Sequence, residues 1–161
     1  MKIRPVTDAD ESAIWSILEP VIRAGETYTL PQDLTEHEAL DYWLAPGNTV
    51  FVAEDDEGKV AGTYFIHMNQ RGGGSHVSNC GYVTATWATG RGVARAMCAH
   101  SLDYARAQGF RAMQFNFVVS TNTRAVQLWE SFGFGIVGRL PRAFRHPTAG
   151  FVDALVMYRE L

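Results

Sequence analysis

Strand-like and helix-like segments follow one another along this chain in an order that restricts the fold more than any other feature. Seven segments have the alternation or the β-branched content of strands, at residues 2–6, 49–54, 59–68, 76–85, 111–119, 134–140 and 151–159. Apolar spacings of three and four residues predict four helices, at residues 8–24, 35–45, 92–108 and 122–132. The order β-α-α-β-β-β-α-β-α-β-β indicates an α/β protein with one mixed sheet and helices on its faces.

The ends of these segments carry their own signals. Thr35 and Glu38 form a capping box that predicts the start of the second helix, and Gly25 is expected to end the first. The glycines of segment 71–74 precede a strand and not a helix, so they predict a hairpin loop. A loop that contains proline, from residue 141 to residue 150, is predicted between the last two strands.

Length and composition favour one domain over residues 1–161 and argue against several classes of partner. The net charge is −3 with no long basic run, which argues against nucleic acid. No apolar run approaches the roughly 18 residues of a membrane span, and the N-terminus lacks the apolar core of a signal peptide. Neither the two cysteines nor the five histidines have metal-ligand spacing. We therefore expect a cytoplasmic protein with no membrane, nucleic-acid or metal partner.

The segment Gly90–Gly92, between the fourth strand and the third helix, is where the sequence best predicts a ligand site. Its glycines let the backbone turn tightly and leave its N–H groups open to a ligand. The following helix adds unpaired N–H groups and the positive end of its dipole, which together favour phosphate. Arg91 and Arg95 add positive charge. A Rossmann motif is excluded, because Arg95 stands where its third glycine would be.

Two motifs of this chain resemble those of the GNAT acetyltransferases. Segment Thr89–Ala94 is similar to the family's acyl-CoA loop, Gln/Arg-x-x-Gly-x-Gly/Ala, except that Thr89 replaces Gln or Arg. Downstream, Asn122-x-x-Ala125-x-x-Leu128-Trp129-x-x-x-Gly133-Phe134 resembles the family's Asn-x-x-Ala-x-x-Leu-Tyr-x-x-x-Gly-Phe helix. The resemblance covers nearly the whole chain. It implies acetyl-CoA as co-substrate and the GNAT fold, a mixed sheet of about seven strands splayed at the cofactor site and flanked by about four helices.

The resemblance also implies which residues surround the cofactor. They lie on the fourth strand, in the glycine loop and at the start of the last helix: Tyr82, Val83, Thr84, Thr89, Gly90, Arg91, Gly92, Val93, Ala94, Arg95 and Asn122. The main-chain N–H near Tyr82 is expected to stabilise the oxyanion that forms from the thioester carbonyl. Trp129 stands where many family members have an acidic tyrosine, and an indole N–H is no acid near neutral pH. Asn122 is therefore expected to hydrogen-bond the CoA thiolate, to cap its helix, or to do both.

Polar residues on the splayed strands are the candidates for acceptor binding. Asn79 and Asn116 lie within apolar strands, where asparagine is unfavourable unless it has a polar partner. Their spacing with Asn122 resembles that of the yeast family members that acetylate the proline analogue azetidine-2-carboxylate. This implies that Asn79 and the main chain of Asn116 and Phe117 hold a small amino-acid carboxylate. Purely structural roles for the asparagines are the alternative.

The sequence leaves the proton chemistry open. Glu26 lies in the loop between the first two helices, which covers the acceptor in this family, so it is a candidate for acceptor binding and for the base. His76 and a chain of waters are the other candidates for the base. Cys80 has no base paired with it in the sequence, which favours a packing role over acyl-enzyme chemistry.

These observations predict one activity and leave two alternatives. The prediction is an N-acetyltransferase that moves the acetyl group of acetyl-CoA directly to a small-molecule amine, such as an amino acid or a proline-like analogue. An acyl-CoA sensor with little catalysis is one alternative, because Trp129 replaces tyrosine. An acetyltransferase of protein N-termini or lysines is the other. Dimers are common in the family, so a homodimer is one expectation.

Overall fold

Seven strands form one mixed sheet in the computed structural model, which describes residues 1–161. The strands are β1 Lys2–Pro5, β2 Thr49–Glu54, β3 Val60–Met68, β4 Val77–Thr84, β5 Ala112–Val119, β6 Gly135–His146 and β7 Gly150–Glu160. The α-helices are α1 Glu11–Ala24, α2 Glu36–Trp43, α3 Val93–Ala107 and α4 Thr123–Ser131. The strand order is β1-β2-β3-β4-β5-β7-β6, and every neighbouring pair is antiparallel except β4 and β5. The predicted fold class is confirmed.

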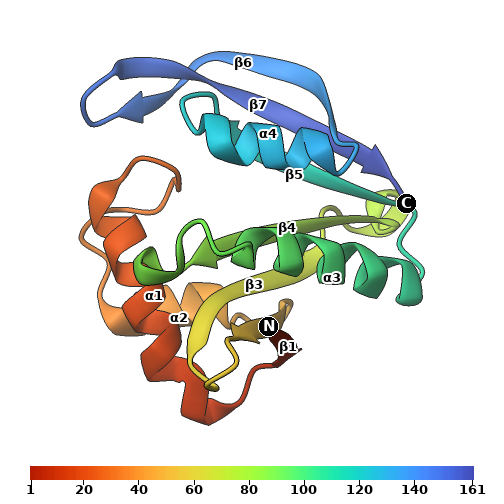
Figure 1. The fold of residues 1–161 in the computed structure, drawn as a ribbon. Coiled ribbons are helices and arrows are strands. Elements are labelled where there is room, and N and C mark those ends of the chain that lie inside the picture. The colour runs from red at the N-terminus through yellow and green to blue at the C-terminus, as the bar shows by residue number, and fades with distance from the viewer.

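The helices cover both faces of the sheet (Figure 1). Consecutive residues of a strand point to opposite faces, and Gly62 and Thr63 of β3 show which helices lie where. A Cβ atom at Gly62 would come within 2.7 Å of Val93 in α3, so only glycine lets α3 pack this closely. On the other face, the indole Nε1 of Trp43 in α2 donates to Thr63 Oγ1 at 3.0 Å. Helices α1 and α2 therefore lie opposite α3.

The sheet is interrupted between β4 and β5. These parallel strands pair only at Val77 with Ala112 and at Ser78 with Met113. Beyond those pairs the strands separate, and Figure 1 shows the gap widening away from the C-terminus. The splayed sheet expected from the family resemblance is therefore present.

The prediction of a loop over residues 141–150 is wrong. Strand β6 continues to His146 and pairs with β7 up to a short turn. Its register shifts between Leu140 and Phe144, and this bulge holds the proline. A proline is tolerated here because β6 is an edge strand and the residues of a bulge are not paired with the neighbouring strand. The missing N–H of proline therefore costs no hydrogen bond of the sheet. Arg142 has a φ of 52°, and its N–H donates to the Asp153 carboxylate at 2.9 Å.

An ion-pair cluster ties the N-terminal strand to the start of α1. The buried carboxylate of Asp10 accepts hydrogen bonds from Nη1 and Nη2 of Arg4, both at 2.8 Å. It also accepts one from the N–H of Thr7 at 2.7 Å. Arg4 also binds Glu54 of β2. The Arg4 guanidinium, followed by the Thr7 hydrogen bonds, holds the pKa of Asp10 well below its usual range.

We expect Asp10→Asn to lower the free energy of unfolding at pH 7 by about 1–3 kcal/mol, because it leaves Arg4 poorly paired. The stabilisation from Asp10 is complete above its unfolded pKa of about 3.9 and is lost as the pH falls towards its lower folded pKa. The difference between wild type and variant should therefore shrink between about pH 4 and pH 2. Urea denaturation at several pH values measures it. Asp8→Asn, at an exposed residue of the same turn, is the control. An equal difference at pH 7 and pH 2.5 would contradict this reading.

Candidate active site

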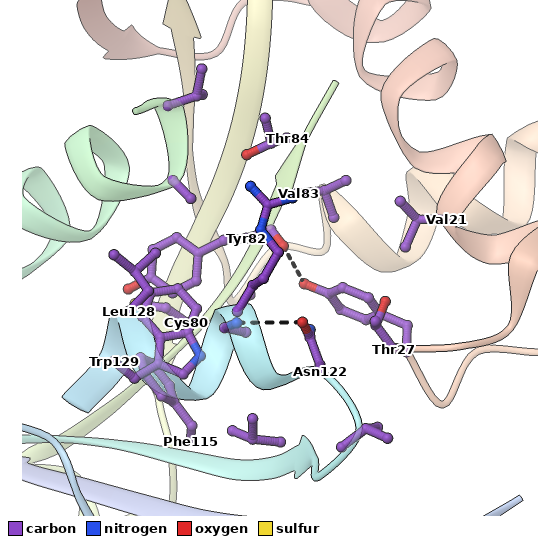
Figure 2. Close-up of a pocket in the computed structure, with 18 of the residues that line it drawn as sticks. Val21, Thr27, Cys80, Tyr82, Val83, Thr84, Phe115, Asn122, Leu128 and Trp129 are labelled. Atoms are coloured by element: carbon purple, nitrogen blue, oxygen red, sulfur yellow. Dashed lines mark hydrogen bonds between the residues drawn. The ribbon is translucent and has the colours of Figure 1, made fainter. Parts of the chain in front are cut away.

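A cavity of about 850 Å³ opens where β4 and β5 diverge. Both faces of the sheet contribute to its walls. Tyr28, Tyr42 and Phe65 come from the side of α1 and α2, and Trp129 of α4 comes from the other side (Figure 2). The glycine loop before α3 also lines it. The cavity therefore passes through the sheet, and two molecules can meet in it from opposite faces.

The glycine loop has the geometry of a phosphate site. Gly90 and Gly92 have φ values of 82° and 80°, a region that residues with a Cβ atom rarely adopt. A Cβ at either position would meet no atom within 4 Å, so the space above the loop is open. The N–H groups of Gly92, Val93 and Ala94 donate to no backbone carbonyl. The loop and the first turn of α3 therefore fit a pyrophosphate, which needs several donors at once.

The charge lining the cavity is positive. Arg95 and Arg124 line it, and no aspartate, glutamate or histidine does. This favours phosphates and carboxylates over cations. Arg91 was expected at the cofactor, but its guanidinium lies over the exposed ring of Trp87, 5.6 Å from the centroid, and is not part of the lining. The Arg91 N–H donates to the Ala88 carbonyl at 3.2 Å, so the Arg91 main chain adds no free donor to the loop.

The main chain of β4 presents Tyr82 to the gap. Peptide groups alternate in direction along a strand, and the N–H of Ala85 donates to Ala61 of β3 at 2.8 Å. By this alternation the N–H and C=O of Tyr82 point away from β3, towards the place that β5 has left. The Tyr28 hydroxyl donates to the Tyr82 carbonyl at 3.0 Å, as Figure 2 shows by a dashed line. The Tyr82 N–H has no strand partner and is free for a ligand.

Asn122 lies at the start of α4, beside the same gap (Figure 2). Its Oδ1 accepts the N–H of Ala125 at 3.4 Å, so the side chain caps the helix. Its Nδ2 has no partner within the protein. Asn122 can therefore cap its helix and donate to a ligand at the same time, which is one of the alternatives that the sequence allowed.

Three asparagine side chains join β4 to β5 where their backbone pairing stops. The Oδ1 of Asn69, just after β3, accepts Asn79 Nδ2 at 3.2 Å and Asn116 Nδ2 at 2.7 Å. Gln114 donates to Asn116 Oδ1 at 2.8 Å. The expected polar partners of Asn79 and Asn116 are thus present, and both asparagines line the cavity, as Phe117 does. Asn79 shares its face of β4 with Gly81, which lies against Phe65, so this amide cluster is on the side of α1 and α2.

Comparison with known proteins decides what this cavity belongs to. Residues 14–134 match the acetyltransferase (GNAT) family, which is most of the chain. The chain belongs to the GNAT acetyltransferase family. It is therefore an N-acetyltransferase, and acetyl-CoA is its acetyl donor.

The relatives of this GNAT protein agree in sequence and in fold. The N-acetyltransferase aca1 of Schizosaccharomyces pombe is 28% identical over 151 residues, which cover 84% of this chain and 72% of the relative. A GCN5-related N-acetyltransferase from Kribbella flavida superposes with a TM-score of 0.95 at 43% identity, over 99% of this chain and 97% of the other. The yncA protein of Salmonella typhimurium, solved with its cofactor acetyl-CoA, superposes with a TM-score of 0.87 at 22% identity, over 100% of this chain and 94% of the other. At that identity the likeness to yncA concerns the fold.

Trp129 lies in α4, at the position where the family motif that this segment resembles has a tyrosine. Its side chain is 8% exposed and packs on Tyr82 and Phe115, with ring centroids 5.0 Å away in each case. The Tyr82 hydroxyl is turned away from the gap, towards Ser101 at 2.8 Å. Trp129 thus fills the space beneath the cofactor side of the cavity and has no proton to give at neutral pH.

The structure does not bring the two expected base candidates into the cavity. Glu26 is exposed and outside the lining, although its neighbours Thr27 and Tyr28 are part of it. Three consecutive residues, 27–29, line the cavity, and the sequence alone does not show where along the loop that contact begins. His76 is exposed and also outside the lining. Burial raises the pKa of Cys80 to about 12, so its thiol is no nucleophile.

Sequence reasoning missed three residues of the site. Tyr28 and Arg124 line the cavity, and Asn69 holds the amide cluster together. Arg124 lies between Asn122 and Ala125 in the predicted motif, so its helix position was a usable signal. No periodic pattern marks Asn69, which follows β3 and meets its partners on β4 and β5 only in the folded sheet.

None of the helices is long and apolar enough to cross a lipid bilayer. No group of three or more histidine, cysteine, aspartate or glutamate side chains is arranged to hold a metal ion.

Proposed function

We propose that this chain transfers the acetyl group of acetyl-CoA directly to the amine of a small carboxylate-bearing molecule, an amino acid or a proline-like analogue. The observation that carries the proposal is the amide cluster of Asn79, Asn69 and Asn116 on the side of α1 and α2. The Nδ2 groups of Asn79 and Asn116 each give one hydrogen to Asn69 Oδ1 and keep a second hydrogen. With no carboxylate in the lining, these neutral donors suit a carboxylate ligand.

The cofactor side of the cavity supports the same assignment. The free N–H groups of Gly92, Val93 and Ala94 suit the pyrophosphate, and Tyr82, Val83 and Thr84 line the gap towards the acetyl end. Bound acetyl-CoA supplies an acetyl group activated by a good thiolate leaving group. As the C–N bond forms and the C–S bond breaks, the Tyr82 N–H stabilises charge on the carbonyl oxygen, and Asn122 Nδ2 stabilises the leaving sulfur.

Proton transfer in this proposal runs through solvent. No carboxylate or histidine lines the cavity, so water takes the ammonium proton before the attack and a second proton from the nitrogen once the C–N bond has formed, and water gives one proton to the leaving thiolate. The acceptor reacts as the neutral amine, and its rate therefore rises with pH towards the pKa of that amine.

A second candidate, an acyl-CoA sensor with little catalysis, is favoured by Trp129 alone. The sensor predicts tight acetyl-CoA binding with no release of CoA thiol for any acceptor. Transfer to protein N-termini predicts that peptides outperform free amino acids. Homodimerisation and a cytoplasmic location stay predictions from the sequence.

The proposal predicts that Asn79→Ala weakens binding of the acceptor through its carboxylate. Loss of one hydrogen bond to a charged group costs about 1.5–3 kcal/mol, so KM for proline or azetidine-2-carboxylate should rise at least about tenfold. For pyrrolidine or azetidine, which lack the carboxylate, KM should hardly change. Steady-state release of CoA thiol measures both.

Met68→Ala is the matched control, because Met68 is exposed on the neighbouring strand and outside the cavity. This variant should leave KM unchanged for all four acceptors. If Asn79→Ala raises KM equally for the acids and for the amines, Asn79 has a structural role and the carboxylate proposal is wrong.

A further inference from the structure

Tyr28 occupies a fixed position at the open end of the β4–β5 gap. It comes from the loop between α1 and α2, and its hydroxyl donates to the Tyr82 carbonyl at 3.0 Å. Its ring packs edge-on against Trp43, with centroids 6.1 Å apart. A Cβ at Gly81 would lie 3.2 Å from the Tyr28 hydroxyl and 2.6 Å from the Phe65 ring. Glycine at position 81 therefore leaves the room that this hydroxyl needs.

The hydroxyl lies on the same strand edge as the free N–H of Tyr82. In an extended residue the N–H and the C=O point to the same side. A carbonyl oxygen that accepts the Tyr82 N–H would therefore lie next to the Tyr82 carbonyl, where the Tyr28 hydroxyl already points. A small rotation of that hydroxyl would direct its hydrogen to the ligand oxygen.

Tyr28 stays a donor at all pH values of interest. Burial raises the pKa of its hydroxyl above the ordinary value. The group is therefore neither a general base nor a source of negative charge beside a developing oxyanion.

From this geometry we infer that the Tyr28 hydroxyl is the second donor of the oxyanion hole, acting together with the Tyr82 N–H. When an amine attacks the thioester carbonyl carbon, the electron pair of the C=O bond moves onto oxygen, and both donors face that oxygen. The hydroxyl donates to the thioester oxygen already before the attack, in place of the Tyr82 carbonyl, and this hydrogen bond strengthens as negative charge develops on that oxygen. No bond to Tyr28 forms, and its proton stays on it throughout. The inference rests on the proposed role of the Tyr82 N–H and not on the class of acceptor.

Kinetics of Tyr28→Phe test the inference. Loss of one oxyanion donor costs about 10²–10³ in kcat. Because the Tyr82 N–H remains, we expect kcat to fall about 10- to 100-fold, with KM for acetyl-CoA changed less than about threefold. Tyr104→Phe is the control, since Tyr104 packs on Phe51 outside the cavity and its hydroxyl makes no hydrogen bond within the protein. An unchanged kcat overturns the inference, and so does a rise in acceptor KM alone.

An infrared measurement separates this role from simple anchoring of the loop. With acetyl-CoA carrying ¹³C at the carbonyl and no acceptor present, two donors should lower the carbonyl stretching frequency more in wild type than in Tyr28→Phe. Affinity for CoA, which lacks the acetyl group, should be the same in both proteins. Equal carbonyl frequencies, or no lowering in wild type, overturn the inference. This readout does not depend on the acceptor, so it cannot fail merely because the proposed acceptor class is wrong.

Discussion

Replacing Gly92 with valine should weaken acetyl-CoA binding at least about 100-fold. Gly92 has a φ of 80°, where a residue with a Cβ atom is strained by about 1–2 kcal/mol. The new side chain would also stand in the open space above the N–H groups of the loop and block hydrogen bonds worth about 1.5–3 kcal/mol each to a charged phosphate. Titration calorimetry of the purified variant with acetyl-CoA measures the loss.

Gly58→Val supplies a matched control for this variant. Gly58 has a φ of 81° and equally open surroundings, but it lies in the turn between β2 and β3, outside the cavity. The control should lose similar stability and keep its acetyl-CoA affinity. If both variants bind like wild type, the glycine loop is not the pyrophosphate site.

Replacing Asn122 should reduce turnover much more than cofactor binding. We expect Asn122→Ala to lower kcat about 10- to 100-fold, because the leaving thiolate loses a hydrogen-bond donor worth about 1.5–3 kcal/mol. The Kd of acetyl-CoA should change less than about threefold, since the phosphates stay on the glycine loop. The lost helix cap costs about 1 kcal/mol of stability. Initial rates and calorimetry on the same preparation separate these effects.

Asn122→Asp distinguishes the cap from the donor. Aspartate caps helices as well as asparagine does, but it offers no N–H and brings a negative charge towards the leaving sulfur. The variant should keep the stability of wild type and lose at least as much kcat as the alanine variant. A kcat near that of wild type in Asn122→Asp would leave Asn122 with a capping role only.

Local signals in the sequence predict the helices and turns whose positions depend on interactions between residues close together in the chain. The apolar spacing, the capping box at Thr35 and the glycine at position 25 place helices within one to three residues of where they lie. Gly90 and Gly92 predict the open loop at the start of α3. The splay of β4 from β5 is expected from the family resemblance and not from any periodicity, because the alternation of neither strand marks the residue at which their pairing ends.

Features set by contacts across long sequence separations were missed or misplaced. Asn69 and Asn116 are 47 residues apart, and only the sheet brings them together. Proline at position 141 predicts a loop by its missing N–H, yet an edge strand with a bulge accommodates it. Which of Glu26 and Tyr28 faces the cavity depends on the course of a loop, and the hydrogen bond to β4 selects Tyr28.

The proposal that this protein acetylates a small carboxylate-bearing amine has a direct test on the wild-type protein. The test compares kcat/KM for an amino acid with kcat/KM for the same amine without the carboxylate. Release of CoA thiol is followed with proline and pyrrolidine, with azetidine-2-carboxylate and azetidine, and with a peptide N-terminus as a further acceptor. We predict that kcat/KM of at least one acid exceeds that of its amine by about tenfold or more, as one hydrogen bond to a carboxylate requires. Equal values for acids and amines, a preference for the peptide, or acetyl-CoA binding without thiol release for any acceptor would contradict it.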